Sequence, residues 1–309
     1  MQETAEKGQT VYPAPLKKGD TIGLVAPAGF WEEEDLIRGV RILSQYGFKV
    51  KIARNLTVRE KYLAGTDTHR SALFNDIWRD GEVKAVLAVR GGYGCLRILS
   101  AIDYDLISSC PKILIGFSDI TALHSAIWQK TGLVTFHGPM VTTLAKIDRD
   151  SLLSFFETLT SGCCRPLTAR SLEILKGGNG RGKLVGGNLT TAVHLLATPH
   201  EVSWRDKIVF LEDTGEAPYR IDRMLSHLKM AGRFAGVRGL ILGTFTNCGD
   251  EEIIWSRVME LLAEEDFPIW ANFPIGHGER NMIVPLGSEA IQDSSNGMLT
   301  FPGPCCRNP

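Results

Sequence analysis

Short apolar runs alternate with helical patterns over residues 21–136, and this alternation restricts the fold of the chain more than any other feature. Each apolar run is too short for a buried helix and is followed by apolar residues spaced three and four apart, as on one helix face. Parallel strands need such helical crossovers, which cover both faces of a sheet. The pattern predicts an α/β domain over residues 1–150 with a parallel sheet, its strands at residues 21–26, 48–53, 84–89, 113–115 and 133–136.

The regular alternation of strand and helix patterns ends in the second half of the chain. Residues 151–183 contain a short helical pattern, loop-like sequence and a glycine-rich run at residues 176–180, which is typical of a connection between domains. Strand-like runs follow at residues 207–211 and 237–245, with helical patterns between and after them. The 309 residues are enough for two hydrophobic cores. We therefore expect a smaller α+β domain over residues 184–309.

The composition is that of an ordinary globular protein. Apolar residues make up 44% of the chain and charged residues 22%, which argues against disorder. The net charge of −1 offers no attraction for nucleic acid or an anionic membrane. The chain opens without an apolar targeting segment and has no apolar run of membrane-spanning length. We expect a cytoplasmic protein with neither nucleic acid nor membrane as partner.

Seven cysteines are distributed without a metal or disulfide pattern. None belongs to a CxxC pair, and none lies with histidine at a zinc-ligand spacing. Two adjacent pairs, Cys163-Cys164 and Cys305-Cys306, lie in loop-like or terminal sequence. In the reducing compartment expected for this chain, we interpret all seven as free thiols, so neither a metal site nor a disulfide is predicted.

Ser118 lies in a strand–turn–helix segment, residues 112–132. An apolar strand ends at Gly116, and a helical pattern begins after Asp119. At the carboxyl end of such a strand, a hydroxyl faces the usual ligand site, and amides of the first helical turn stabilise negative charge. Serine and aspartate also cap helices here, so the segment alone leaves a nucleophile and a cap open. Ile120 departs from the G-x-S-x-G elbow, which disfavours an ordinary α/β-hydrolase.

The turn at residues 90–94, Arg-Gly-Gly-Tyr-Gly, follows a buried strand. Its three glycines permit positive φ angles and a close approach of the backbone to a ligand, so the turn suits an oxyanion or a phosphate. A tight turn alone also explains the pattern. The dinucleotide fingerprint G-x-G-x-x-G is absent, which counts against a nucleotide-dependent enzyme that uses this turn.

Further candidates lie elsewhere in the chain. Glu212 ends the strand at residues 207–211, where a buried carboxylate needs a partner. Of the seven histidines, His277 has the most suggestive setting, a glycine-flanked loop, and His137 follows a strand end. A serine, a histidine and a carboxylate are the groups that a Ser-His-acid site requires. The sequence alone does not show whether Ser118, Glu212 and His277 converge.

The chain resembles the LD-carboxypeptidases, also called muramoyltetrapeptide carboxypeptidases, peptidase family S66. The resemblance rests on motifs that follow one another in the family's order from about residue 15 to residue 295. Many separate motifs in a fixed order are more specific than any one of them. They are LKKGD at 16–20 leading into VAPAG, RGGYG at 90–94, IGFSDITALH at 115–124, FHGPM at 136–140, LVGGNL at 184–189, FLEDTGEAPYRIDRML at 210–225 and IGHG at 275–278.

The resemblance implies a flavodoxin-like or Rossmann-like N-terminal domain, a smaller C-terminal domain and an active site between them. It implies Ser118 as nucleophile, His277 as base and Glu212 as acid. Glu216 is the alternative acid, and we prefer Glu212 because a strand end holds a side chain more rigidly than a loop does. The oxyanion would be bound by backbone N–H groups of Asp119, Gly91 and Gly92.

The implied reaction is hydrolysis of the bond between an L-configured centre and the terminal D-alanine of murein tetrapeptides, through an acyl-enzyme, in cell-wall recycling. It needs no metal or organic cofactor, and the resemblance suggests a homodimer. A related branch cleaves a peptide–nucleotide antibiotic and confers self-immunity, but the EDTGEAPYRIDR run at residues 212–223 resembles the murein branch. A non-catalytic ligand-binding protein on the same scaffold is the alternative from another class. Residues expected to shape the substrate site, with packing roles equally open, are Arg90, Tyr93, His137, Asn188 and Tyr219.

Overall fold

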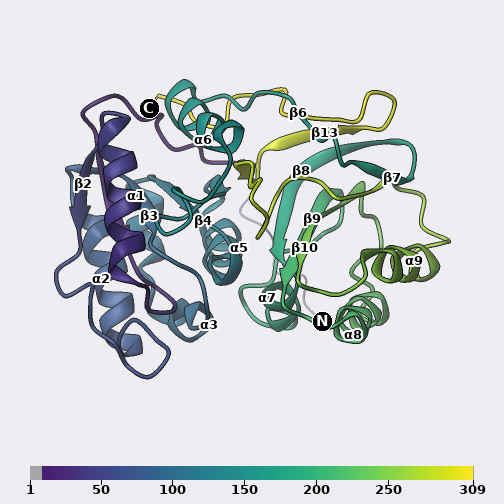
Figure 1. The fold of residues 1–309 in the computed structure, drawn as a ribbon, viewed down its shortest axis with the longest axis horizontal. Helices are drawn as coiled ribbons and strands as arrows, with labels where there is room; N and C mark the ends of the chain where they lie inside the picture. Colours follow the sequence, from purple (N-terminus) through teal and green to yellow (C-terminus); the bar gives the residue numbers. More distant parts are fainter. Residues whose placement is uncertain (1–8, 309) are drawn as a thin grey trace.

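The computed structural model describes residues 9–308 and contains two sheets, each accompanied by helices (Figure 1). In the first sheet, five strands are parallel and the last is antiparallel to its neighbour. They are β1 (Thr21–Val25), β2 (Lys49–Ile52), β3 (Val83–Ala88), β4 (Ile113–Gly116), β5 (Thr135–His137) and β12 (Val284–Leu286). Their order in space is β12-β5-β4-β3-β1-β2. The predicted α/β fold with a parallel N-terminal sheet is confirmed.

Helical segments connect the strands of the first sheet, as parallel pairing requires. They are α1 (Glu33–Gln45), α2 (Asp67–Arg79), α3 (Cys95–Ile98), α4 (Tyr104–Ser109) and α5 (Thr121–Thr131), with 3-10 turns η1 (Leu99–Ala101) and η2 (Ser118–Ile120). After β5, α6 (Arg149–Ser161) leads to the second sheet. α5 ends at Gly132 in the left-handed conformation that glycine favours. His124 on α5 is fully buried and bonds to Thr135 and to the Gly116 carbonyl, which ties the helix to β4 and β5.

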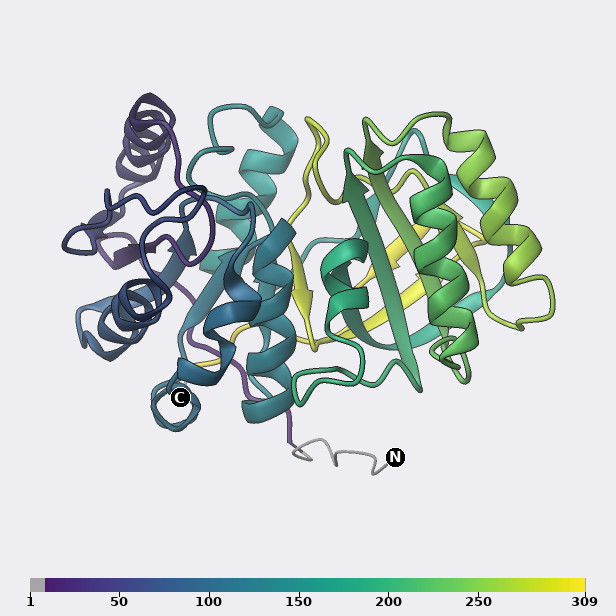
Figure 2. The same ribbon diagram turned by 90° about the horizontal axis from the view of Figure 1, so that it is seen from below.

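The second sheet is mixed, with the order β6-β14-β13-β8-β9-β10-β11-β7. Its strands are β6 (Leu167–Thr168), β7 (Glu173–Lys176), β8 (Asn179–Asn188), β9 (Lys207–Thr214), β10 (Gly239–Thr246), β11 (Ile269–Ala271), β13 (Glu289–Asp293) and β14 (Met298–Thr300). β8 to β11 run parallel and the outer strands antiparallel. The helices are α7 (Leu189–His194), α8 (Pro218–Met230) and α9 (Glu251–Leu261). Figure 2 shows α8 and α9, in green and yellow-green, side by side on one face of this sheet.

Sheet membership does not follow the predicted domain bounds at every point. β12 lies within residues 184–309 but joins the first sheet, where Val284 pairs with His137. β7 and half of β8 lie within the predicted connection, residues 151–183, but belong to the second sheet. At the end of the chain, the Arg307 N–H donates to the Pro13 carbonyl at 2.9 Å. The bounds of the domains stay a prediction.

The glycine-rich strand β8 was not predicted, and close backbone contacts explain its composition. A Cβ atom at Gly186 would lie 1.9 Å from the carbonyl oxygen of Phe210 on β9, and one at Gly182 would lie 2.5 Å from that of Asp206. Glycine is required where two backbones approach so closely. Because these positions carry no side chain, they also carry no period-two hydrophobic signal, and the strand resembles a loop in the sequence.

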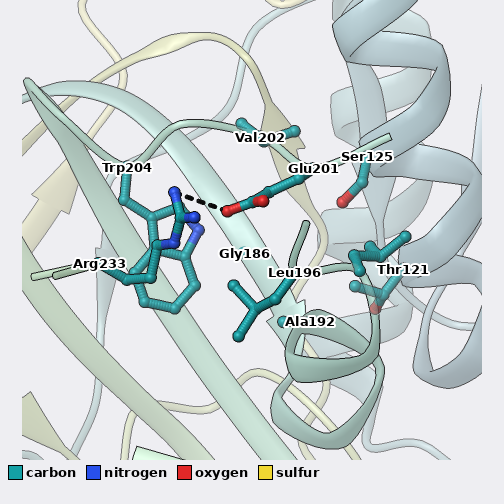
Figure 3. Close-up of a pocket in the computed structure, with 10 residues that line it drawn as sticks. Thr121, Ser125, Gly186, Ala192, Leu196, Glu201, Val202, Trp204 and Arg233 are labelled. Atoms are coloured by element: carbon teal, nitrogen blue, oxygen red, sulfur yellow. Dashed lines mark ion pairs between the residues drawn. The ribbon is translucent and has the colours of Figure 1, made fainter. Parts of the chain in front are cut away.

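The two sheets meet where α5 packs against β8 and α7. The Asn188 N–H donates to the Thr121 hydroxyl at 3.0 Å. A Cβ atom at Gly187 would lie 2.4 Å from that same hydroxyl oxygen, so only glycine fits the contact. Figure 3 shows a small cavity between the two sheets. Thr121 and Ser125 of α5 line one side of it, and residues that include Trp204 and Arg233 line the other. Its volume of about 20 Å³ suits about one water molecule rather than a substrate.

Buried apolar side chains of both sheets form one continuous core. The two halves of the molecule therefore pack on each other through apolar contacts, and the loops at their junction are held in place. Among residues 9–308, no helix has both the length and the apolar character needed to cross a bilayer.

Candidate active site

Ser118 stands at the sharp turn between β4 and α5. Its φ angle is +63°, in the left-handed region that costs a non-glycine residue energy and recurs at functional sites. Gly116 allows this turn, because a Cβ atom there would lie 2.8 Å from the Ile120 side chain. The Ser118 side chain is half-buried and begins the turn η2, which continues into α5. The serine is thus presented at the amino end of a helix, as predicted for a nucleophile.

His277 and Glu212 form a hydrogen-bonded pair, with 2.6 Å between His277 Nδ1 and Glu212 Oε2. Glu212 lies near the end of β9 and is fully buried, whereas His277 keeps 19% of its side chain exposed. A Cβ atom at Gly276 would lie 2.7 Å from Glu212 Oε2, so the glycine makes room for the carboxylate. The carboxylate therefore orients the imidazole with Nε2 on the opposite side of the ring.

The loop that carries His277 is fixed on both sides of the histidine. The Gly276 N–H donates to Asn281 Oδ1 at 3.1 Å, and the Gly278 N–H donates to the Thr244 hydroxyl at 3.2 Å. The His277 ring packs edge-on against Phe117, with 4.8 Å between ring centroids. Phe117 directly precedes Ser118, so the histidine lies beside the serine turn. Within residues 9–308, Ser118 and His277 do not share a hydrogen bond, and the contact would have to tighten in a substrate complex.

Burial and mutual attraction set the pKa values of this pair. Burial lowers the pKa of His277. The charge of Glu212 and its hydrogen bond raise that pKa by more than burial lowers it, so the net pKa lies above the ordinary 6.5. Burial raises the pKa of Glu212 above its ordinary value, and His277 opposes that rise. A carboxylate that stabilises protonated histidine is what a Ser-His-acid mechanism requires of the pair.

The glycine turn after β3 lies directly against Ser118. A Cβ atom at Gly91 would lie 3.0 Å from Ser118 Oγ. The Gly91 carbonyl accepts from the Gly29 N–H at 3.0 Å, which holds the turn in place. Within the described part of the chain, the N–H groups of Gly91 and Gly92 donate to no acceptor. The Asp119 N–H is in the first helical turn, where amides have no intrahelical acceptor. The three predicted oxyanion donors thus have no other backbone acceptor among residues 9–308, and their role stays a prediction.

Two buried side chains that sequence reasoning missed hold these loops together. The Asp119 carboxylate accepts from the Cys95 N–H at 2.8 Å, which joins the serine turn to α3 after the glycine turn. Burial raises the pKa of Asp119. Arg70 of α2 is buried and donates to the carbonyls of Pro27 and Gly94. A charged residue on the buried face of a predicted helix was the signal for Arg70, since such a side chain needs partners.

Asn188 and His137 both lie in the interior near the His277–Glu212 pair. Asn188 caps α7 through Oδ1, and its Nδ2 donates to the buried Asp213 carboxylate at 2.9 Å. His137 is fully buried between Phe117 and Phe210, and neither ring nitrogen has a partner among the described residues. Burial, followed by the nearby imidazoles, lowers its pKa well below the ordinary value, so the ring is neutral.

The other predicted residues lie at the surface. Arg90 is exposed and donates to the Phe30 carbonyl at 2.7 Å, and the exposed Tyr93 packs against Tyr62. Tyr219 is 58% exposed and lies at the start of α8. In the described part of the chain, it makes no hydrogen bond or ring contact with Ser118 or His277. Glu216 pairs with Arg220 at 3.4 Å rather than with His277. Their substrate roles stay predictions. No group of three or more His, Cys, Asp or Glu residues within 9–308 is arranged to hold a metal ion.

On an α/β fold, a strand-end serine whose turn lies beside a buried histidine–glutamate pair offers the groups that a serine hydrolase uses. Comparison with known families makes the assignment specific. The LD-carboxypeptidase N-terminal domain matches residues 22–138, and the LD-carboxypeptidase C-terminal domain matches residues 181–291. The chain belongs to this family, peptidase family S66, as the sequence motifs predicted.

Individual relatives agree with this assignment. A probable murein peptide carboxypeptidase of Bacillus subtilis is 39% identical over 297 residues, which cover 92% of each chain. The solved muramoyltetrapeptide carboxypeptidase of Oxalobacter formigenes has a TM-score of 0.78 at 29% identity and covers 90% of this chain and 97% of that one. The structure of MccF in complex with glutamyl sulfamoyl guanosine has a TM-score of 0.89 at 25% identity, over 96% and 99% of the two chains.

Proposed function

We propose that the protein is a serine-type LD-carboxypeptidase that removes the terminal D-alanine from murein tetrapeptides by cleaving an L,D-peptide bond. The observation that carries the proposal is the His277–Glu212 hydrogen bond of 2.6 Å beside the turn that presents Ser118. Relatives named as murein peptide and muramoyltetrapeptide carboxypeptidases support the substrate. On this proposal the protein acts in the cytoplasm, in cell-wall recycling, and forms a homodimer.

The chemistry follows from the three side chains. Nε2 of His277 takes the proton of Ser118 while Oγ attacks the scissile carbonyl, and Glu212 stabilises the imidazolium that forms. N–H groups of Gly91, Gly92 and Asp119 bind the oxyanion. His277 then protonates the departing amine of D-alanine, which leaves an ester between Ser118 and the tripeptide. Water hydrolyses that ester with His277 as base, and the mechanism consumes no cofactor.

Hydrolysis of an aminoacyl or peptidyl nucleotide is a second candidate function. The MccF structure with glutamyl sulfamoyl guanosine has a higher TM-score, 0.89, than the muramoyltetrapeptide carboxypeptidase, 0.78. MccF is named as a microcin C7 self-immunity protein. The same serine, histidine and glutamate would serve this reaction, because both substrates are attacked at an acyl carbon.

Release of D-alanine from purified murein tetrapeptide tests the proposal. The wild-type protein is incubated with tetrapeptides that carry diaminopimelate or lysine at the third position, and with glutamyl sulfamoyl adenosine. We expect free D-alanine and a tripeptide with at least one tetrapeptide, at a higher kcat/KM than for the nucleotide. Hydrolysis of the nucleotide alone would favour the self-immunity function. Binding of tetrapeptide without any hydrolysis would favour a ligand-binding protein and contradict both activities.

A methyl group at Gly91 is expected to disturb the reaction specifically. In Gly91→Ala, the new Cβ atom would lie 2.8 Å from Ser118 Cβ, so the serine or the glycine turn must shift. Because a displacement of about 1 Å in the reacting groups costs about 10²-fold, we expect kcat for D-alanine release to fall by about that factor. Gly81→Ala is the matched control, since its Cβ atom meets nothing within 4 Å. Unchanged kcat in Gly91→Ala would contradict the assigned place of this turn.

A further inference from the structure

The two adjacent cysteine pairs of the sequence come together in the folded protein. Cys163 and Cys164 follow α6, and Cys305 and Cys306 lie in the segment after β14. The N–H groups of Cys305 and Cys306 both donate to the Gly162 carbonyl, at 2.7 and 3.1 Å. A single carbonyl thus places the second pair against the first, although the two pairs are far apart in the chain.

Three of these four thiols are buried, and they contact one another. Cys305 is fully buried, Cys164 and Cys306 nearly so, and Cys163 is exposed. The thiol of Cys305 shares hydrogen bonds with those of Cys164 and Cys306. The Cys164 thiol also donates to the Thr158 hydroxyl at 3.7 Å. All seven cysteines of the chain are free thiols in this structure.

The hydrogen bonds make the two contacting thiols chemically unequal. Those from Cys164 and Cys306 lower the pKa of the Cys305 thiol. The contact with Cys305 and burial raise the pKa of Cys164. Of the two thiols, Cys305 therefore loses its proton more readily and is the nucleophile of the pair, and Cys164 supplies the second thiol.

We propose that Cys164 and Cys305 form an oxidation site, at which a peroxide converts the two contacting thiols into a disulfide that ties the end of the chain to α6. The Cys305 thiolate attacks one oxygen of hydrogen peroxide, breaks the O–O bond and becomes a sulfenic acid, and the released hydroxide takes up a proton as water. The Cys164 sulfur then attacks the Cys305 sulfur, loses its proton and expels a second water. Two thiols lose two electrons in all, and one peroxide gains them.

Such a bond would close a covalent loop that contains every strand of the second sheet. β6 to β11, β13 and β14 all lie between residues 164 and 305. Closing a long loop removes conformational entropy from the unfolded chain, and the stabilisation grows with loop length. We expect the oxidised protein to unfold at a Tm about 5 °C or more above that of the reduced protein.

Mass spectrometry of the full chain tests the site. Protein is treated with hydrogen peroxide, the remaining thiols are blocked with N-ethylmaleimide, and proteolytic peptides are mapped with and without dithiothreitol. The expected result is a reducible cross-link between Cys164 and Cys305, accompanied by the rise in Tm. Cys164→Ser and Cys305→Ser are expected to lose both, and Cys110→Ser, at an exposed cysteine outside the cluster, to keep both.

Three results would overturn the proposal. One is quantitative labelling of Cys164 and Cys305 by N-ethylmaleimide in denatured protein after peroxide has oxidised the exposed Cys110. Another is a cross-link between a different pair of the four cysteines. The third is a cross-link between Cys164 and Cys305 without any rise in Tm. The map is made on the wild-type chain, so the test does not depend on the folding of any variant.

Discussion

Ser118→Ala is expected to lower kcat for D-alanine release by about 10⁴-fold or more, because removing the nucleophile of a Ser-His-acid site removes the acyl-enzyme route entirely. The fold should be unaffected. Alanine occupies the same backbone conformation as serine, with the same cost at φ +63°, and the serine side chain caps no helix in the structure. The measurement is D-alanine release from murein tetrapeptide, together with thermal unfolding to establish that Tm is unchanged.

Ser125→Ala is the matched control for this variant. Ser125 lies on α5, about two helical turns after Ser118, and lines the small cavity between the two sheets. The same hydroxyl is removed within one continuous turn–helix segment, so any general effect of losing a hydroxyl appears in both variants. We expect Ser125→Ala to keep kcat within about threefold of the wild type. If Ser118→Ala retained more than a tenth of the wild-type kcat, Ser118 would not be the nucleophile.

The sequence predicted those features of the fold and site that depend on local patterns. Strand and helix alternation gave the parallel sheet, and the apolar run before Ser118 placed the serine at the end of β4. Glycines marked the turn at residues 90–94. Each signal lies within one short segment, where periodicity and turn chemistry act directly. The order of family motifs extended this to the second half of the chain.

Features that depend on contacts between distant segments were not predictable in this way. The strand-end position favoured Glu212 over Glu216 without showing its partner. The partner is His277, which lies 65 residues away in the chain and bonds to Glu212. The roles of the Arg70 and Asp119 side chains likewise depend on which carbonyls and amides the folded loops bring to them. β8 was missed because close backbone approach, rather than side-chain burial, determines its glycines.

Glu212→Gln is expected to change both the rate and the pH dependence of the reaction. The amide keeps the size of the side chain but cannot stabilise imidazolium or enforce the correct tautomer, and we expect kcat to fall by about 10³- to 10⁴-fold. The neutral form of His277 is the base, so wild-type kcat/KM is lost as the pH falls through the His277 pKa, which lies above the ordinary 6.5. Without the carboxylate charge, the burial that lowers this pKa is no longer opposed.

The acid limb of kcat/KM in Glu212→Gln should therefore lie at lower pH than in the wild type. The measurement is a pH profile of residual D-alanine release, with Tm recorded at each pH to exclude unfolding. Glu216→Gln is the control, because Glu216 pairs with Arg220 and makes no bond to His277. It should leave the rate and the limb unchanged. A loss of rate in Glu216→Gln together with an unshifted limb in Glu212→Gln would make Glu216 the acid, since only a carboxylate bonded to His277 can move its titration in this direction.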